Sequence, residues 1–199
     1  MSFITTVWEA TKATSLIEWL AVISSITYVI LAAKQLIICW LFAFIGSALF
    51  VYLCYVGDLY IESILQLFYV IMAVVGWISW KKSTSHLFIT KWKLKSHLLN
   101  IILSGSVALM LGYLFEIYTN QANPYIDAFT TCYSLSATFM VTKKILGNWI
   151  YWIIIDIASI YLYAQQGYNL AAVQYGIFTI LALFGFIAWN TQFKTQSNA

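Results

Sequence analysis

The sequence contains very little charge. Only 9% of its 199 residues are charged and 62% are hydrophobic, whereas a soluble protein usually has about 25% charged residues. A soluble domain of this length could not bury so much apolar surface, so the composition excludes that class. Apolar runs of about 20 residues recur along the chain, and each is long enough to cross the hydrocarbon core of a bilayer. The sequence therefore predicts an all-α polytopic membrane protein.

Cysteines and catalytic motifs are also scarce. The three cysteines, Cys39, Cys54 and Cys132, are scattered in apolar surroundings without a CxxC pattern or a Cys/His cluster, which argues against a disulfide or a metal site. The chain has no nucleotide-binding glycine loop, no HExxH and no GxSxG motif. We therefore expect no metal, no cofactor and no enzymatic activity. The net charge of +3 gives no reason to expect nucleic acid as a partner.

The chain does contain an internal repeat. Residues 34–80 and 143–189 align without a gap at a constant offset of 109 residues, and most of the differences exchange one apolar residue for another. Identical pairs include Trp40 and Trp149, Gly76 and Gly185, and Trp80 and Trp189. A repeat of this length in a membrane chain is typical of transporters, in which the substrate binds between the two copies.

Seven segments are predicted to be transmembrane helices. They lie near residues 16–33, 36–56, 62–80, 97–118, 124–142, 147–165 and 171–190. The first three form repeat one (16–80), the last three form repeat two (124–190), and residues 97–118 form a linker helix. Because three is odd, two triplets joined directly would face opposite ways, and one extra helix restores a parallel orientation. We expect a single transporter domain over residues 1–199, with two parallel three-helix repeats in a 3+1+3 arrangement.

The lysines predict the orientation in the membrane. The loop after the third segment carries Lys81, Lys82, Lys91, Lys93 and Lys95, and lysine-rich loops face the cytoplasm. Four more lysines fall on the same side, namely Lys34, Lys143, Lys144 and Lys194. The opposite loops carry Asp58, Glu62 and Glu116, and Lys12 is the one lysine placed outside. We expect a multi-pass protein of the inner (plasma) membrane with its amino terminus outside and its carboxyl terminus in the cytoplasm.

Longer patterns carry a resemblance to a known family. They are Gln66-Leu-Phe-Tyr69 followed by Gly76-Trp77 and Trp80, and Asn148-Trp149-x-x-Trp152-x-x-x-Asp156. On these the chain resembles the PnuC family of vitamin transporters, whose architecture is similar to that of the SWEET sugar transporters. The resemblance implies facilitated diffusion of a vitamin precursor into the cytoplasm, with nicotinamide riboside as the leading candidate. It also suggests a homotrimer. Thiamine and riboflavin carriers are the alternatives within the family, and a structural or sensory membrane protein is the alternative outside it.

Asp156 is the only acidic residue that the predicted spans place at mid-membrane depth. A charge there costs about 2.5–3.5 kcal/mol, which a cationic ligand such as a pyridinium or thiazolium ring would offset. The alternative is a protonated or hydrogen-bonded aspartate that joins two helices. Trp149 and Trp152 share a helical face with Asp156, and their indole rings suit a flat aromatic cation. We therefore predict substrate contact by Asp156, Trp152 and Trp149.

The other candidate substrate ligands are Gln66, Tyr69, Trp77 and Trp40. Gln66 and Tyr69 lie one above the other on the third span, where an amide and a hydroxyl could bind polar edges of a vitamin; the alternative for Gln66 is a hydrogen bond between helices. Trp40 matches Trp149 in the repeat, which makes the two plausible walls or gates of a path, although Trp149 could instead belong to the interfacial belt.

Trp80 and Trp189 end their repeats at matching positions. Both fall at the ends of spans, where tryptophans commonly anchor a helix at the membrane surface. We therefore expect these two residues to be interfacial anchors.

Overall fold

The structure, a computed structural model, describes residues 3–57, 60–82, 88–119 and 123–197. Within these ranges the chain forms eight α-helices and no strand, apart from an isolated bridge between Thr90 and Ile145. The helices are α1 (Phe3–Ala13), α2 (Leu16–Ala33), α3 (Cys39–Val56), α4 (Tyr60–Lys82), α5 (Leu94–Tyr118), α6 (Pro124–Thr142), α7 (Asn148–Gln165) and α8 (Asn169–Ser197). Asp58, which entered the charge argument, lies outside the described residues.

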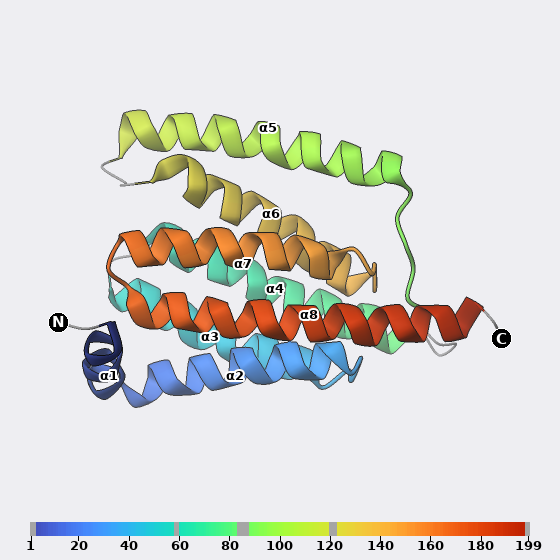
Figure 1. Ribbon diagram of the computed structural model, residues 1–199, viewed down its shortest axis with the longest axis horizontal. Helices are drawn as coiled ribbons and strands as arrows, with labels where there is room; N and C mark the ends of the chain where they lie inside the picture. Colours follow the sequence, from blue (N-terminus) through green and yellow to red (C-terminus); the bar gives the residue numbers. More distant parts are fainter. Residues whose placement is uncertain (1–2, 58–59, 83–87, 120–122, 198–199) are drawn as a thin grey trace.

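A helix is present at each of the seven predicted ranges. The largest difference is at α8, which continues to Ser197 instead of ending at residue 190. α3 begins at Cys39 rather than at residue 36, because Gln35 takes a positive φ of 56° and breaks the helical path after α2. The sequence analysis did not predict α1. This short helix lies across one end of the bundle (Figure 1).

Local signals explain where α2 and α6 begin. The Ser15 side chain accepts a hydrogen bond from the Glu18 N–H, and the Glu18 carboxylate accepts one from the Ser15 N–H. This capping box satisfies two N–H groups that a helix start leaves without partners. α6 begins at Pro124, whose fixed φ and missing N–H suit the first helical position.

Helices α2 to α8 run side by side along the long axis of the molecule (Figure 1). In each set of three, consecutive helices pack together: α2 on α3 and α3 on α4, then α6 on α7 and α7 on α8. The sets meet where α2 packs on α8 and α4 packs on α6. α5 packs mainly against α6, and His97 near its start also reaches Tyr151 on α7. The fold is therefore two packed sets of three helices with α5 on the outside.

Five helices are long and apolar enough to cross a membrane: α2, α3, most of α4, α5 and most of α8. α6 and α7 fall short of that limit, and they carry most of the buried polar side chains. These are Ser134, Thr138 and Thr142 on α6, and Asn148, Asp156 and Ser159 on α7. A polar side chain is stable at membrane depth only where protein or water surrounds it. The chain is thus an all-helical polytopic membrane protein with its polar interior along α6 and α7.

The two ends of the bundle differ in charge. We call one the lysine end: there α4 finishes at Lys81 and Lys82, α6 is followed by Lys143 and Lys144, and α8 carries Lys194 near its last turn. The other is the α1 end. The described acidic residues lie at the α1 end, except Asp156 in the middle of α7: Glu9, Glu18, Glu62, Glu116 and Asp127. Charge is therefore separated along the axis of the bundle.

Candidate functional site

Four tryptophans form a buried cluster near the lysine end. Trp40 on α3 meets Trp80 on α4 edge to face, with ring centroids 5.3 Å apart. Trp149 on α7 meets Trp189 on α8 in the same way, at 5.4 Å. Trp80 and Trp189 join the two pairs at 6.4 Å. Edge-to-face pairs of this kind add stability beyond the area that they bury, so the cluster links the two sets of helices.

Two glycines make room for this cluster. A Cβ at Gly76 would lie 2.4 Å from Cε2 of Trp40, and a Cβ at Gly185 would lie 2.6 Å from Cη2 of Trp149. A methyl group cannot fit at these distances. The indole rings therefore pack directly on the backbones of α4 and α8.

Trp80 and Trp189 bind backbone carbonyls across the bundle. The Trp80 Nε1–H donates to the Val141 carbonyl at 3.3 Å, and the Trp189 Nε1–H donates to the Ala32 carbonyl at 3.1 Å. Each of these carbonyls also accepts a backbone N–H in the turn that follows its helix, from Lys144 and Gln35. The indole bonds tie α4 to α6 and α8 to α2. The expectation that both tryptophans are interfacial anchors is wrong, because they are only 7% and 0% exposed.

The indole N–H groups of Trp40 and Trp149 have a different environment. Both side chains are buried, and within the described part of the chain neither Nε1 has a hydrogen-bond partner. A buried donor without a partner is rare and destabilising. The two predicted site residues therefore present unused donors at matching places in the fold.

Asp156 lies in the interior on α7, and its side chain is 2% exposed. Among the residues that the structure describes, the one ion pair is Lys12 with Glu9 at the α1 end. No lysine therefore neutralises Asp156 from within the described chain. Its carboxylate interacts electrostatically with Tyr175 on α8, which extends the polar interior to a third helix.

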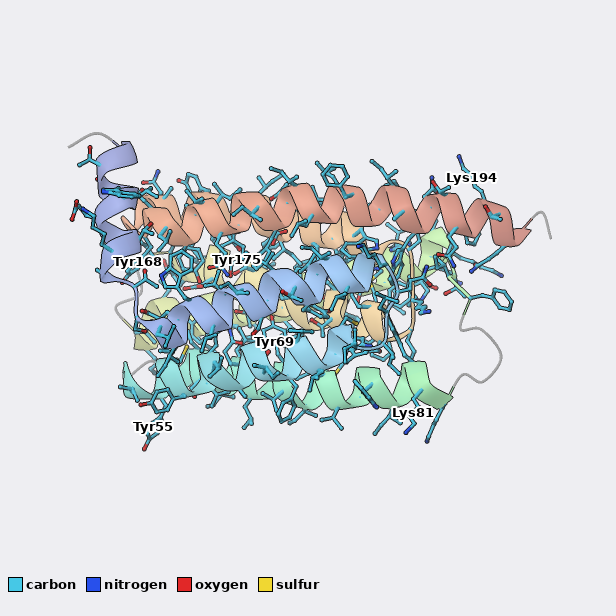
Figure 2. The ribbon with its side chains drawn as sticks, turned by 90° about the horizontal axis from the view of Figure 1, so that it is seen from below. Tyr55, Tyr69, Lys81, Tyr168, Tyr175 and Lys194 are labelled. Atoms are coloured by element: carbon cyan, nitrogen blue, oxygen red, sulfur yellow. The ribbon has the colours of Figure 1, made fainter. Side chains whose placement is uncertain are left out.

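Four tyrosines from α2, α4, α7 and α8 surround the interior near Asp156. Tyr163 and Tyr175 stack with ring centroids 5.2 Å apart and planes at 10°, and their hydroxyls are hydrogen-bonded. Tyr69 on α4 is hydrogen-bonded to Ser134 on α6 and interacts with Tyr175. Tyr28 on α2 lies close to Tyr69 and its ring is 5.8 Å from that of Trp40. Figure 2 shows Tyr69 and Tyr175 between the two ends of the bundle.

The structure brings the predicted site residues into two connected groups. Tyr69 and Asp156 are linked through Tyr175. Trp40 and Trp149 belong to the tryptophan cluster, and Trp77 and Trp152 pack against the same buried core, which we call the tryptophan core. Gln66 is half-buried on α4, one turn from Tyr69.

Sequence reasoning missed Tyr28, Tyr163 and Tyr175. Tyr175 could have been found, because it stands 109 residues after Gln66, which is the offset of the repeat.

Lys144 lies beside the tryptophan core, in the turn between α6 and α7. Its Nζ is 4.7 Å from the centroid of the Trp80 ring. Burial lowers the pKa of this ammonium, and the nearby Cys39 opposes the shift. A desolvated ammonium over an indole face is a cation–π contact. Lys144 therefore packs on the tryptophan cluster at the lysine end.

The site has groups that can bind a solute. It combines a buried carboxylate with aromatic faces and unused indole donors. Within the described residues, no group of three His, Cys, Asp or Glu side chains could hold a metal ion.

The sequence model of the nicotinamide mononucleotide transporter family matches residues 15–191. The chain belongs to this transporter family. Among its relatives is the nicotinamide riboside transporter PnuC of Escherichia coli (strain K12), 26% identical over 203 residues, which cover 88% of this chain and 85% of the relative. The protein of the same name from Neisseria mucosa is 25% identical over 204 residues, covering 90% and 75%. The PnuC resemblance is thereby confirmed.

A solved structure agrees with the fold. The crystal structure of the vitamin B3 transporter PnuC superimposes with a TM-score of 0.77 at 21% identity, covering 97% of this chain and 90% of the other. At that identity the likeness shows the fold. The PnuC family and the apolar helices together make this chain a multi-pass inner-membrane protein.

The first prediction concerns the contacts of Gly76 with Trp40 and of Gly185 with Trp149. Gly76→Ala and Gly185→Ala should each destabilise the protein by about 1–3 kcal/mol, because the added methyl group overpacks a buried indole. Gly176→Ala is the matched control, since no heavy atom lies within 4 Å of a Cβ there. Thermal unfolding of the purified protein in detergent measures the effect. Equal melting temperatures for Gly76→Ala and Gly176→Ala would contradict the packing described here.

The second prediction separates hydrogen bonding from ring size. Trp189→Phe should lower stability by about 1 kcal/mol more than Trp149→Phe, because only Trp189 donates a hydrogen bond to a carbonyl. Both changes remove the same ring volume from the same cluster. Thermal unfolding again serves as the measurement, and a smaller loss for Trp189→Phe would refute the role of the bond to Ala32.

Proposed function

We propose that this chain facilitates the diffusion of nicotinamide riboside into the cytoplasm. The observation that carries the proposal is the buried Asp156 carboxylate, which no described lysine neutralises, in the aromatic interior of a PnuC-family chain. Its relatives from Escherichia coli and Neisseria mucosa are named as transporters of this compound. The pyridinium ring of nicotinamide riboside has a fixed positive charge, which complements the carboxylate.

The neighbouring side chains supply the remaining interactions. Tyr175 and Tyr69 offer ring faces and hydroxyls near Asp156, and Gln66 adds an amide one turn from Tyr69. Trp152 stands one turn from Asp156 on α7 and offers an indole face for stacking with the pyridinium. A substrate with a flat cationic ring and a polar ribose can use both kinds of contact.

Trp40, Trp149 and Trp77 form the wall of the path toward the lysine end. Trp40 and Trp149 each keep an indole N–H without a partner, so a passing hydroxyl or amide oxygen could accept a hydrogen bond there. Trp77 packs against the same core. Opening this end requires the two tryptophan pairs to separate, which makes the cluster the gate of the proposed path.

The 3+1+3 repeat is part of the proposal, with repeat one at 16–80, the linker helix at 97–118 and repeat two at 124–190. Residues 109 apart share unusual environments. Gln35 and Lys144 have positive φ angles of 56° and 49°, and the carbonyls of Ala32 and Val141 both accept an indole N–H. A two-fold axis along the membrane normal explains why α2 packs on α8 and α4 on α6. Such an axis leaves the substrate path between the repeats.

The orientation and assembly are proposed on the same basis. The lysine end faces the cytoplasm and the α1 end faces outward, by the positive-inside rule. All seven helices α2 to α8 cross the bilayer in this arrangement. The family resemblance suggests that three copies assemble, and light scattering of the detergent-purified protein would show whether they do.

Thiamine is the second candidate substrate. Its thiazolium ring also has a fixed positive charge, and Asp156 favours a cation without selecting between the two vitamins. Riboflavin lacks such a charge, so this carboxylate does not favour it.

The third prediction tests Asp156 directly. Asp156→Asn should weaken binding of nicotinamide riboside and thiamine by about tenfold or more, because an interaction with a charged group contributes about 1.5–3 kcal/mol. Riboflavin binding should change little. The control is Glu9→Gln, which makes the same carboxylate-to-amide change at an exposed site on α1. Calorimetry with all three vitamins gives the comparison, and unchanged affinity for both cations would eliminate the proposed role.

The fourth prediction concerns orientation. A membrane-impermeant thiol reagent should label Lys12→Cys in intact cells, and should label Lys82→Cys only after the membrane is permeabilised. The unmodified protein is the background control, because Cys39 and Cys132 are buried and Cys54 is half-buried. The reverse labelling pattern would overturn the assigned orientation.

A further inference from the structure

A cavity lies at the lysine end, apart from Asp156 and its tyrosines. It has a volume of about 230 Å³ and opens between the segment before α5, the start of α7 and the last part of α8. Its polar lining comes from Lys91, His97 and Asn190, with Trp92 and Gly147 between them. The cavity reaches the surface of the bundle, since Ile150 on its wall is 47% exposed.

Aromatic contacts hold the polar groups of this cavity in place. The His97 ring lies on the backbone of Gly147, where a Cβ would be 2.6 Å from Cε1. Its Nδ1 is 3.3 Å from the Tyr151 hydroxyl, and its ring is 5.5 Å from Trp92. The Lys91 Nζ lies 4.3 Å from the centroid of the Phe193 ring on α8. The ammonium of Lys91 and the amide of Asn190 line the cavity as donors for a ligand, and Nε2 of His97 adds a ring nitrogen beside them.

The electrostatics of this region favour an anion. α5 and α7 both begin here, at the N-cap residues Lys93 and Gly147, and neither start is capped by a side chain. Helix starts carry partial positive charge and bind phosphate well. The carboxylates that the structure describes lie at the α1 end or at mid-depth on α7. No described acidic side chain at the lysine end therefore competes for Lys91.

The position of the cavity indicates which anion it meets. It lies at the end of the bundle where the apolar helices give way to lysines, which is the level of lipid headgroups. The side chains of Leu98 on α5 and Ile154 on α7 lie further along their helices than His97 and Ile150 of the cavity wall. They are 50% and 53% exposed and offer apolar surface for acyl chains. We propose that the cavity formed by Lys91, His97 and Asn190 binds the phosphate group of an anionic membrane lipid. This inference does not depend on the identity of the transported vitamin.

The fifth prediction uses phosphatidylglycerol as the probe and phosphatidylcholine as its zwitterionic counterpart. Native mass spectrometry of the whole protein should show retention of phosphatidylglycerol over phosphatidylcholine. Lys91→Gln should weaken that retention about fivefold, the effect of one lysine near a charged headgroup. The matched control is Lys81→Gln, which removes a lysine from the same end but outside the cavity (Figure 2). It should retain the lipid as the unmodified protein does.

A second variant and a soluble probe complete the test. Asn190→Leu keeps every charge but removes an amide from the cavity, and it should also weaken retention. The proposal is overturned if the unmodified protein shows no preference for phosphatidylglycerol, or if Lys91→Gln and Lys81→Gln lose it equally. Thermal stabilisation by inorganic phosphate that Lys91→Gln abolishes, without further gain from phosphatidylglycerol, would overturn the lipid source in favour of a soluble phosphate.

Discussion

Two indole N–H bonds join the halves of this molecule near the lysine end. Trp80 reaches from α4 to the last turn of α6, and Trp189 reaches from α8 to the last turn of α2. Each of the two carbonyls already accepts a backbone N–H from its own turn, and the tryptophan supplies a second donor from the opposite set of helices. The same rings pack against Trp40 and Trp149, which rest on Gly76 and Gly185. Hydrogen bonds to the backbone and ring packing therefore act at one place, and the proposed opening of the lysine end would have to change both together.

The middle of the bundle is organised by a different constraint, which is the placement of polar groups away from lipid. α6 and α7 carry the buried hydroxyls, the Asn148 amide and the Asp156 carboxylate, while α2, α3 and α5 present apolar faces. A carboxylate at this depth is unfavourable unless something compensates its charge. The stacked pair of Tyr163 and Tyr175 extends from that carboxylate toward the acidic α1 end. On the proposed path, a cationic solute would meet negative charge and aromatic faces before it reaches the tryptophan cluster.

The long helices could be predicted from the sequence because apolar length and turn residues are local signals. α6 and α7 were found although their composition is less apolar, since Pro124 and Gly147 mark where they begin. α1 was missed because an 11-residue helix is too short to span a bilayer and leaves no such signal. The buried position of Asp156 was predictable from its place in the middle of a predicted span. The burial of Trp80 and Trp189 was not, because a tryptophan at the end of a span has the same pattern whether it faces headgroups or caps another helix.

Positions 109 residues apart diverge where the solute would bind. The framework positions agree, as Trp40 with Trp149 and Gly76 with Gly185 show, but Asp156 stands opposite Ser47, and Trp152 stands opposite Ala43. Symmetric packing fixes the spacing of the helices, since any change at a glycine or a tryptophan of the cluster would disturb its neighbours. Side chains at mid-depth are free of that constraint, because they face the interior rather than the opposite ring. Under the proposed function, a small and asymmetric vitamin would be recognised within a symmetric scaffold, with its charged ring on the side of α7 and its polar edges toward Gln66 and Tyr69 on α4.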